Sequence, residues 1–227
     1  YDFLAVPVVD TEDRLVGIIT VDDLIDVIEA ETTEDIYTLG GVQSGGDSYF
    51  QSNLFDVARK RVVWLSILLV TNTATTAVIR SQEDILQQVV ALAVFIPLLI
   101  GSGGNVGAQS STVVIRGLNT EEISSKQALS VIQREAIAGT VLGLMLGAVV
   151  TLWAYLIQGS LPVAMTVGLS LVAISILAST AGGALPILFD KLGFDPALMS
   201  APFITTIVDV LGVLIYLTLA RHMLGLA

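Results

Sequence analysis

Five long apolar stretches follow one another after residue 60, at about 62–79, 85–115, 136–157, 163–189 and 201–220. A helix needs about 20 largely apolar residues to cross a lipid bilayer. The helices of a water-soluble bundle would each keep a polar face, but these stretches are apolar on all sides. The pattern therefore predicts an α-helical integral membrane protein with five transmembrane helices.

The start of the chain has a different pattern. Residues 3–9 and 14–20 are predicted to form two short β-strands, joined by a polar turn at 10–13. Thr20 is a candidate N-cap for a helix that starts near Val21, because acidic residues occupy the first turn that follows. A small, partial α/β segment is thus expected before the membrane helices.

Composition supports this division. Hydrophobic residues make up 54% of the 227 positions and charged residues only 14%, whereas soluble domains have about a quarter charged residues. Residues 1–55 hold 12 of the 21 carboxylates and a single base, while residues 56–227 hold nine of each sign. A basic nucleic-acid-binding surface is absent from the sequence, so a nucleic-acid partner is not expected.

Glycine and serine are frequent in residues 40–53, which predicts a flexible linker. The expected parts are the acidic segment 1–35, a linker and membrane-entry segment 36–57, and a five-helix membrane domain 58–227. The chain begins at Tyr1 without a methionine, and we expect it to be part of a longer protein. It contains no cysteine, so oxygen atoms are the plentiful metal ligands, and oxygen suits hard cations such as Mg²⁺ and Ca²⁺.

Basic residues near the helix ends predict the orientation in the membrane. Seven fall on the side of the N-terminus and two on the other side; the seven are Arg59, Lys60, Arg61, Arg116, Lys126, Arg134 and Lys191, and the two are Arg80 and Arg221. The N-terminus is therefore expected in the cytoplasm and the C-terminus outside.

A polar, glycine-rich run interrupts the second apolar stretch. It contains Gly101, Gly104, Asn105, Gln109 and Thr112. Polar groups at membrane depth are tolerated where they line water or are buried in protein, and small residues also allow close helix packing. We interpret the run as a pore lining, with helix packing as the alternative.

The fifth apolar stretch carries a single ionisable residue. Pro202, Thr205, Thr206, Asp209 and Gly212 follow at spacings that place them on one helix face. A carboxylate at the bilayer centre costs about 2.5–3.5 kcal/mol on insertion scales, and no Lys or Arg lies at depth to pair with it. The hypotheses are a cation site or a protonated Asp209 bonded to a neighbouring helix. Two copies on a two-fold axis would supply two carboxylates to one hydrated Mg²⁺.

Carboxylates also dominate the helix predicted after Thr20. Like charges at i,i+4, such as those of Asp22 and Asp26, destabilise a helix by about 0.2–0.5 kcal/mol per pair, and the helix contains no Lys or Arg. A bound divalent cation would offset this repulsion, and a solvated acidic helix without a ligand is the alternative.

The strand–turn–strand sequence Leu-Ala-Val-Pro-Val-Val-Asp and Arg-Leu-Val-Gly-Ile-Ile-Thr-Val-Asp-Asp resembles the second half of a cystathionine-β-synthase (CBS) domain. The resemblance implies pairing of such domains and adenine-nucleotide binding, with Thr20 and Asp23 at the positions of the ribose-contacting motif. Only about half of one domain is present here, so ATP is expected at most in the full-length protein.

The membrane motifs resemble the MgtE family of magnesium channels. They are the run from Pro97 to Gln109, the Val-Ile-Arg-Gly-Leu that ends at residue 118, and the segment from Gly193 through Asp209 to Gly212. The resemblance covers essentially the whole chain. It implies a homodimer in the plasma (inner) membrane, a pore lined by the second and fifth spans, and Asp209 as the central ion-binding carboxylate.

The same resemblance implies gating, in which cytoplasmic Mg²⁺ holds acidic CBS and helix surfaces against the pore mouth. The matching positions here are Asp2, Asp23, Asp26, Glu31, Glu34, Asp35 and, on the membrane side, Asp195. The rival functions are a carrier coupled to Na⁺ or H⁺ and a membrane-anchored nucleotide sensor. An enzyme is not expected, because no Ser–His, Cys–His or paired intramembrane carboxylate arrangement appears. The sequence leaves open the choice among Mg²⁺, Co²⁺, Ni²⁺ and Mn²⁺.

Overall fold

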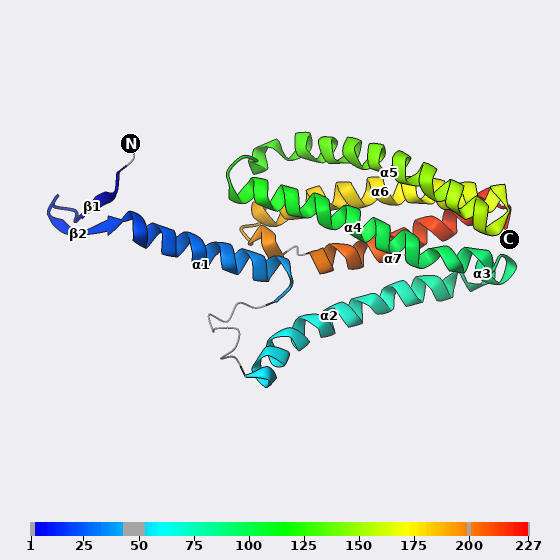
Figure 1. Cartoon of the computed structure of the whole chain (residues 1–227), viewed down its shortest axis with the longest axis horizontal. Helices are drawn as coiled ribbons and strands as arrows, with labels where there is room; N and C mark the ends of the chain where they lie inside the picture. Colours follow the sequence, from blue (N-terminus) through cyan, green and yellow to red (C-terminus); the bar gives the residue numbers. More distant parts are fainter. Residues whose placement is uncertain (1–2, 43–52, 199–200, 227) are drawn as a thin grey trace.

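The computed structural model describes residues 3–42, 53–198 and 201–226 of the chain. Within these residues five long helices form a bundle, and a further helix extends from one end of it (Figure 1). The bundle helices are α2 (Leu54–Ser81), α4 (Ala91–Asn119), α5 (Ala128–Gln158), α6 (Leu161–Lys191) and α7 (Ala201–Met223). All five are long and apolar enough to cross a membrane, in agreement with the predicted fold class.

The segment before the bundle is a hairpin followed by the acidic helix. Strands β1 (Ala5–Val9) and β2 (Leu15–Thr20) pair antiparallel, and α1 (Val21–Leu39) follows directly. In the turn, the Asp10 carboxylate accepts hydrogen bonds from the backbone N–H groups of Arg14 and Glu12, which lowers the pKa of Asp10 below its ordinary value. The predicted strands and helix start are confirmed, and α1 continues four residues past position 35.

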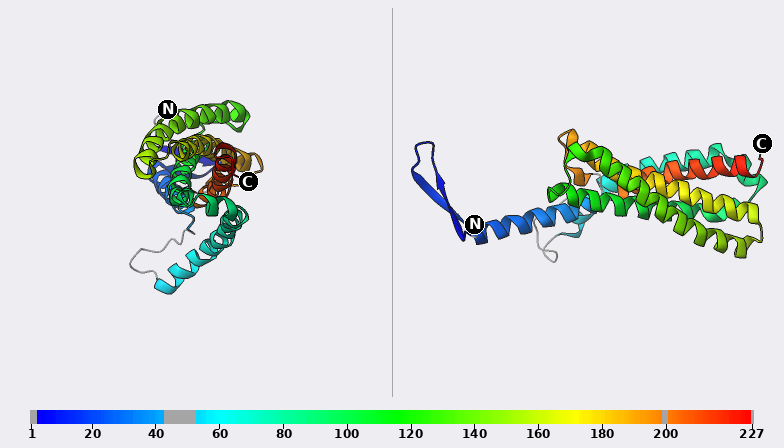
Figure 2. Two further views of the ribbon diagram at one scale, coloured as in Figure 1. Left: turned by 90° about the vertical axis from the view of Figure 1, so that its right-hand side faces the viewer. Right: turned by 90° about the horizontal axis from the view of Figure 1, so that it is seen from above.

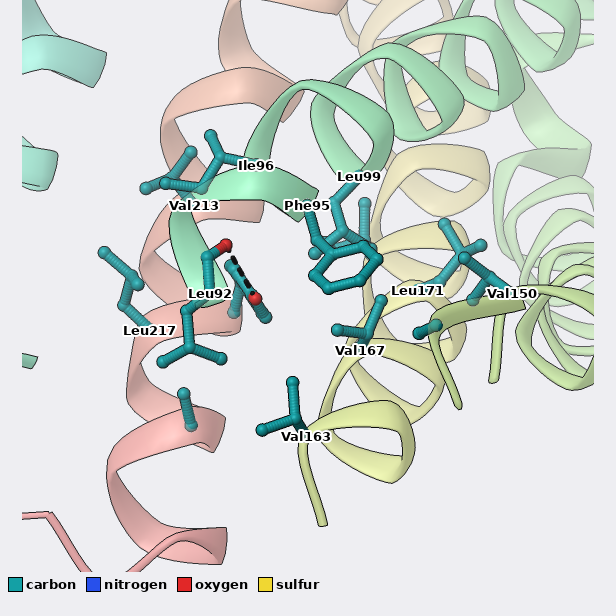
Figure 3. Close-up of a cluster of buried hydrophobic side chains, with 14 of the residues drawn as sticks. Leu92, Phe95, Ile96, Leu99, Val150, Val163, Val167, Leu171, Val213 and Leu217 are labelled. Carbon is teal, nitrogen blue, oxygen red and sulfur yellow. Dashed lines mark hydrogen bonds between the residues drawn. The ribbon is translucent and has the colours of Figure 1, made fainter. Parts of the chain in front are cut away.

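Helix α6 forms the centre of the bundle because it packs against α4, α5 and α7. At the end of the bundle far from α1, side chains of these helices converge on one apolar cluster that includes Leu92, Phe95, Val167 and Leu217 (Figure 3). The buried hydroxyl of Tyr216 donates a hydrogen bond to the carbonyl oxygen of Leu92 at 3.0 Å. The tyrosine therefore adds apolar area to the cluster without leaving an unpaired polar group.

Three glycines bring α5 into backbone contact with α6. Gly139, Gly143 and Gly147 recur every fourth residue, which places them on one face of α5. A Cβ atom on Gly139 would lie 2.7 Å from the carbonyl oxygen of Ser175, and one on Gly143 would lie 3.0 Å from the Cα of Val172. Such close packing is a main source of attraction between helices in lipid, where apolar surfaces gain little from leaving the solvent.

The second apolar stretch is not one helix. It divides into the short helix α3 (Glu83–Gln88) and α4, because Val89 leaves the helical region at φ −133° and ψ 81°. Residues 85–88 therefore belong to a separate element, which corrects the predicted span 85–115. Downstream of the break, α4 stays helical through Pro97 and the glycine-rich run.

The two ends of the bundle carry different features. Helix α1, the connection that contains η1 (Ser125–Gln127) and the short helix η2 (Pro196–Leu198) lie at one end, whereas α3 and the C-terminus lie at the other (Figure 2). The N-terminal and C-terminal segments thus leave from opposite ends, as an odd number of membrane crossings requires.

We expect Gly139→Ala to destabilise the bundle by about 1–3 kcal/mol, since the added methyl group meets the backbone of α6 and one of the helices must move. Thermal unfolding of the purified full-length protein in detergent measures the effect. Gly101→Ala is the matched control, because a Cβ at that helical glycine has no atom within 4 Å. Equal melting temperatures for the two variants would contradict the proposed close contact.

Candidate ion pathway at the contact of α4 and α7

Helices α4 and α7 run in opposite directions and touch at glycines of α4 (Figure 1). A Cβ on Gly104 would lie 3.0 Å from Cγ2 of Thr205, and one on Gly107 would lie 2.9 Å from Cγ2 of Ile204. The absence of side chains at these glycines lets the two helices approach closely. The residues beside this contact on either helix therefore share one region of the bundle.

One face of α4 remains open beside the contact. Gly101, Asn105, Gln109 and Thr112 are exposed and follow at intervals of four, four and three residues, which places them on one helix face. The buried glycines of α4, among them Gly104 and Gly107, lie on the other side. The glycine-rich run thus serves helix packing on one face and presents polar groups on the other.

Asp209 lies on α7 one turn after Thr205, next to the buried Val208. Because the helices are antiparallel, this position is level with Gly101 on α4, where the surface is open. Asp209 is half-buried, and within the described part of the chain its carboxylate has neither a hydrogen-bond donor nor a cation as partner. The hypothesis of a protonated Asp209 requires a hydrogen bond to a neighbouring helix, and no described residue forms one with the Asp209 side chain.

The predicted polar face of α7 is divided in the structure. Pro202, Thr205 and Asp209 are half-buried, whereas Thr206 is only 7% exposed and Gly212 faces Ile174 in the interior. Both threonine hydroxyls donate to the carbonyl oxygen of Pro202 at 2.9 Å. Thr206 and Gly212 lie at the two edges of this face, about 120° apart around the helix, and neighbouring helices bury both edges.

Gly104 and Thr206 were also predicted to line the pore. Both are buried between helices of the protomer, so neither is part of the exposed surface. Close packing is the reason, because Gly104 receives Thr205 at the helix contact. The two residues support the exposed surface from behind.

The acidic positions of α1 do not form one cluster. Asp26, Glu31 and Glu34 are exposed, and no group of three or more potential metal-ligating side chains occurs among residues 3–42, 53–198 and 201–226. The Asp23 carboxylate accepts hydrogen bonds from the hydroxyl and the backbone N–H of Thr20, which lowers the pKa of Asp23 and keeps it ionised. Asp2 lies outside the described residues.

The last turns of α1 dock on the membrane helices. The Asp35 carboxylate accepts a 2.9 Å hydrogen bond from the side-chain amide of Asn119, at the end of α4. Helix α1 also packs against η2, and Asp195 stabilises the start of η2 by accepting the backbone N–H of Ala197 at 2.8 Å. Asp35 and Asp195 thus belong to the same junction, where the acidic helix meets the end of the bundle.

Comparison with protein families matches residues 96–219 to MgtE, a divalent cation transporter family, and residues 1–30 to the CBS domain. The chain is 43% identical over 224 residues to the magnesium transporter MgtE of Thermus thermophilus, a match that covers 99% of this chain and 50% of that protein. It is 40% identical over 220 residues to the magnesium transporters MgtE of Enterococcus faecalis and Bacillus subtilis, covering 97% of this chain and 48% of each relative. The chain belongs to the MgtE family.

The chain spans about half the length of these curated MgtE relatives. The family is one of membrane transport proteins and not of enzymes, in agreement with the motifs of the sequence. The MgtE match contains both the exposed face of α4 and Asp209. The CBS match contains both strands and the first half of α1.

Glu135 was not identified from the sequence as a carboxylate inside the bundle. Glu135 falls just before the predicted third span, 136–157, but α5 begins at Ala128 and carries Glu135 into the bundle. There its side chain accepts hydrogen bonds from Ser110 and Ser179. Ser110 and Ser179 were a weak signal, since buried hydroxyls need partners, but the sequence does not show which residue supplies the partner.

We expect Asn119→Ala to loosen α1 from the bundle, because the Asp35 carboxylate loses its donor. Hydrogen exchange of the backbone amides of residues 30–39 in the purified full-length protein should quicken about two- to tenfold, the effect of one hydrogen bond of modest net strength. Thr120→Ala is the control, since that hydroxyl bonds the carbonyl oxygen of Arg116 in its own helix. Equal exchange in the two variants would show that the Asp35 bond does not hold α1.

Proposed function

We propose that the full-length protein is a magnesium-selective channel or transporter for uptake, in which Asp209 binds the passing ion. The half-buried, unpartnered carboxylate beside the open face of α4 is the observation that carries this proposal. A carboxylate at membrane depth is stable only where water, a cation or a donor reaches it. Carboxylate oxygens and retained water molecules are the ligands that Mg²⁺ prefers, and the amides of Asn105 and Gln109 can bind such waters.

A second copy of the chain completes the site in this proposal. One carboxylate offers a single negative charge to an ion of charge two, and two copies of Asp209 on a two-fold axis would balance it. The exposed polar face of α4 supports such an axis, because amides turned toward lipid would lack hydrogen-bond partners. The ion would keep most of its waters and contact the two carboxylates through them.

In the same proposal the α1 end of the bundle faces the cytoplasm of a plasma-membrane protein. The helix-end basic residues Arg59, Lys60 and Arg61 lie near the start of α2, at this end, and positive charge favours the cytoplasmic side.

The junction of α1 with the bundle supports gating by cytoplasmic Mg²⁺. Exposed carboxylates of α1 repel one another and repel Asp195 when no cation is bound. Bound Mg²⁺ would hold α1 on the junction with Asn119 and close the pathway, and its loss would release the helix. A ligand shifts such an equilibrium only by its greater affinity for the closed state. Asp2 would belong to the same acidic surface, and ATP would bind only once CBS pairing in the full-length protein completes the site at Thr20 and Asp23.

We expect Asp209→Ala to reduce Mg²⁺ uptake into liposomes that contain the full-length protein by at least about tenfold, because the pathway loses the charge that replaces hydration. Asp209→Asn should be nearly as impaired, since the amide keeps the shape but not the charge. Glu83→Gln, at an exposed position of α3, is the control with the same change of charge. Wild-type flux in both Asp209 variants would remove Asp209 from the pathway.

Neutralising Asp23 and Asp26 together should raise the cytoplasmic Mg²⁺ concentration needed to close the pathway by about threefold or more, because fewer carboxylates bind the closing ion. Flux measured at a series of internal Mg²⁺ concentrations shows the shift. The matched control is Glu12→Gln with Asp13→Asn, which removes the same charge from the exposed hairpin turn. Unaltered closure in the Asp23 and Asp26 variant would contradict the gating proposal.

A further inference from the structure

Behind α4, three helices meet at three oxygen atoms that the proposed pathway does not use. The Oε2 atom of Glu135 on α5 accepts hydrogen bonds from Ser110 Oγ on α4, at 2.5 Å, and from Ser179 Oγ on α6, at 3.0 Å. The two serine oxygens are 2.7 Å apart. Ser179 is fully buried and Ser110 is 7% exposed. A carboxylate thus joins α4, α5 and α6 within the bundle.

Helix α6 is shaped to receive this carboxylate. A Cβ atom on Gly183 would lie 2.9 Å from Cγ of Glu135, and one on Gly182 would lie 2.8 Å from Cβ of Ser110. The two adjacent glycines leave room for the glutamate stem and for the close approach of α4. Any side chain at these glycines would displace α5 or α4 from the junction.

The junction holds α4 from the side opposite to its open face. Ser110 is five residues from Asn105, so the two side chains are about 140° apart around the helix axis. Ser110 is buried, whereas Asn105 and Gln109 are exposed. In lipid, apolar side chains make similar contacts when a helix is rotated about its axis to several different angles. A hydrogen bond to a fixed acceptor forms at only one of these angles. The Ser110 bond to Glu135 therefore selects one rotation of α4.

We propose that Glu135 is a positioning residue for ion selection: by holding Ser110 it fixes the rotation of α4 that presents Asn105 and Gln109 to the ion. The inference rests on the proposed function, because it takes the open face of α4 as part of the pathway. Glu135 itself does not contact the ion. It affects ion selection through the rotation of α4 about its own axis.

The test compares Glu135→Leu with Glu135→Gln in the full-length protein. The two replacements are similar in size, but only glutamine keeps an oxygen that accepts from Ser110 and Ser179. The first readout is the ratio of Mg²⁺ to Ca²⁺ flux into liposomes. The second is the reaction rate of Gln109→Cys with a water-soluble methanethiosulfonate reagent, which reports how α4 is turned whether or not ions pass.

We expect Glu135→Leu to lower both the flux ratio and the reaction rate at position 109 by at least about threefold, the size of effect of losing one hydrogen bond. Glu135→Gln should restore most of both. A residue that only stabilised the fold would change the amount of active protein and leave the flux ratio constant, and the melting temperature of each variant records that contribution separately.

Serines of α6 provide a second pair of variants. Ser179→Ala removes a donor to Glu135, whereas Ser170→Ala removes an equally buried hydroxyl that has no hydrogen-bond partner in the described chain. We expect Ser179→Ala to shift both readouts in the direction of Glu135→Leu and Ser170→Ala to shift neither. This pair decides the question if Glu135→Leu does not fold.

Two results would overturn the proposal: equal flux ratios and equal reaction rates at position 109 in Glu135→Leu and Glu135→Gln, or identical behaviour of the two serine variants. Failure of the proposed function gives a different pattern. In that case Asp209→Ala conducts like the wild type, while the reaction rate at position 109 still shows whether Glu135 sets the rotation of α4.

Discussion

An ionised carboxylate inside a bilayer loses the water that stabilises its charge. In the described part of the chain, no hydrogen-bond donor or cation replaces that water at Asp209. The surrounding structure is consistent with a compensating cation. Gly104 lets α7 approach α4, so that Asp209 comes level with the open surface at Gly101. Asn105 continues that surface with a polar side chain. Packing therefore places the half-buried acid beside this open surface, where the proposed ion would pass.

The two carboxylate environments of the bundle are chemically distinct. Glu135 receives two hydroxyl donors at a junction of three helices, so its charge is stabilised by the protein itself. Asp209 receives none in the described residues, so stabilisation must come from outside the protomer. A satisfied carboxylate suits a fixed structural role and an unsatisfied one suits exchange of a ligand. The difference is consistent with the two proposed roles, positioning for Glu135 and ion binding for Asp209.

The length of the apolar stretches was sufficient to predict the five membrane helices. The turn and cap residues were sufficient to predict the hairpin and the start of α1. The break at Val89 was not predicted: Gln87 and Gln88 interrupt the apolar stretch directly before it, but two polar residues alone do not show where the backbone turns. Asp209 could be identified because a lone charge in an apolar helix is rare. The burial of Thr206 and the depth of Glu135 could not, because neighbouring helices decide how each helix is rotated and where it begins.

Cross-linking through position 209 tests most directly whether two copies of this residue face one pathway. The account predicts that Asp209→Cys in the full-length protein forms covalent dimers with a short cross-linking reagent that joins two thiols. Leu152→Cys, at an exposed position of α5, should give no such dimer. Monomers only from Asp209→Cys, or the same yield of dimer at both positions, would contradict a shared pathway lined by Asp209.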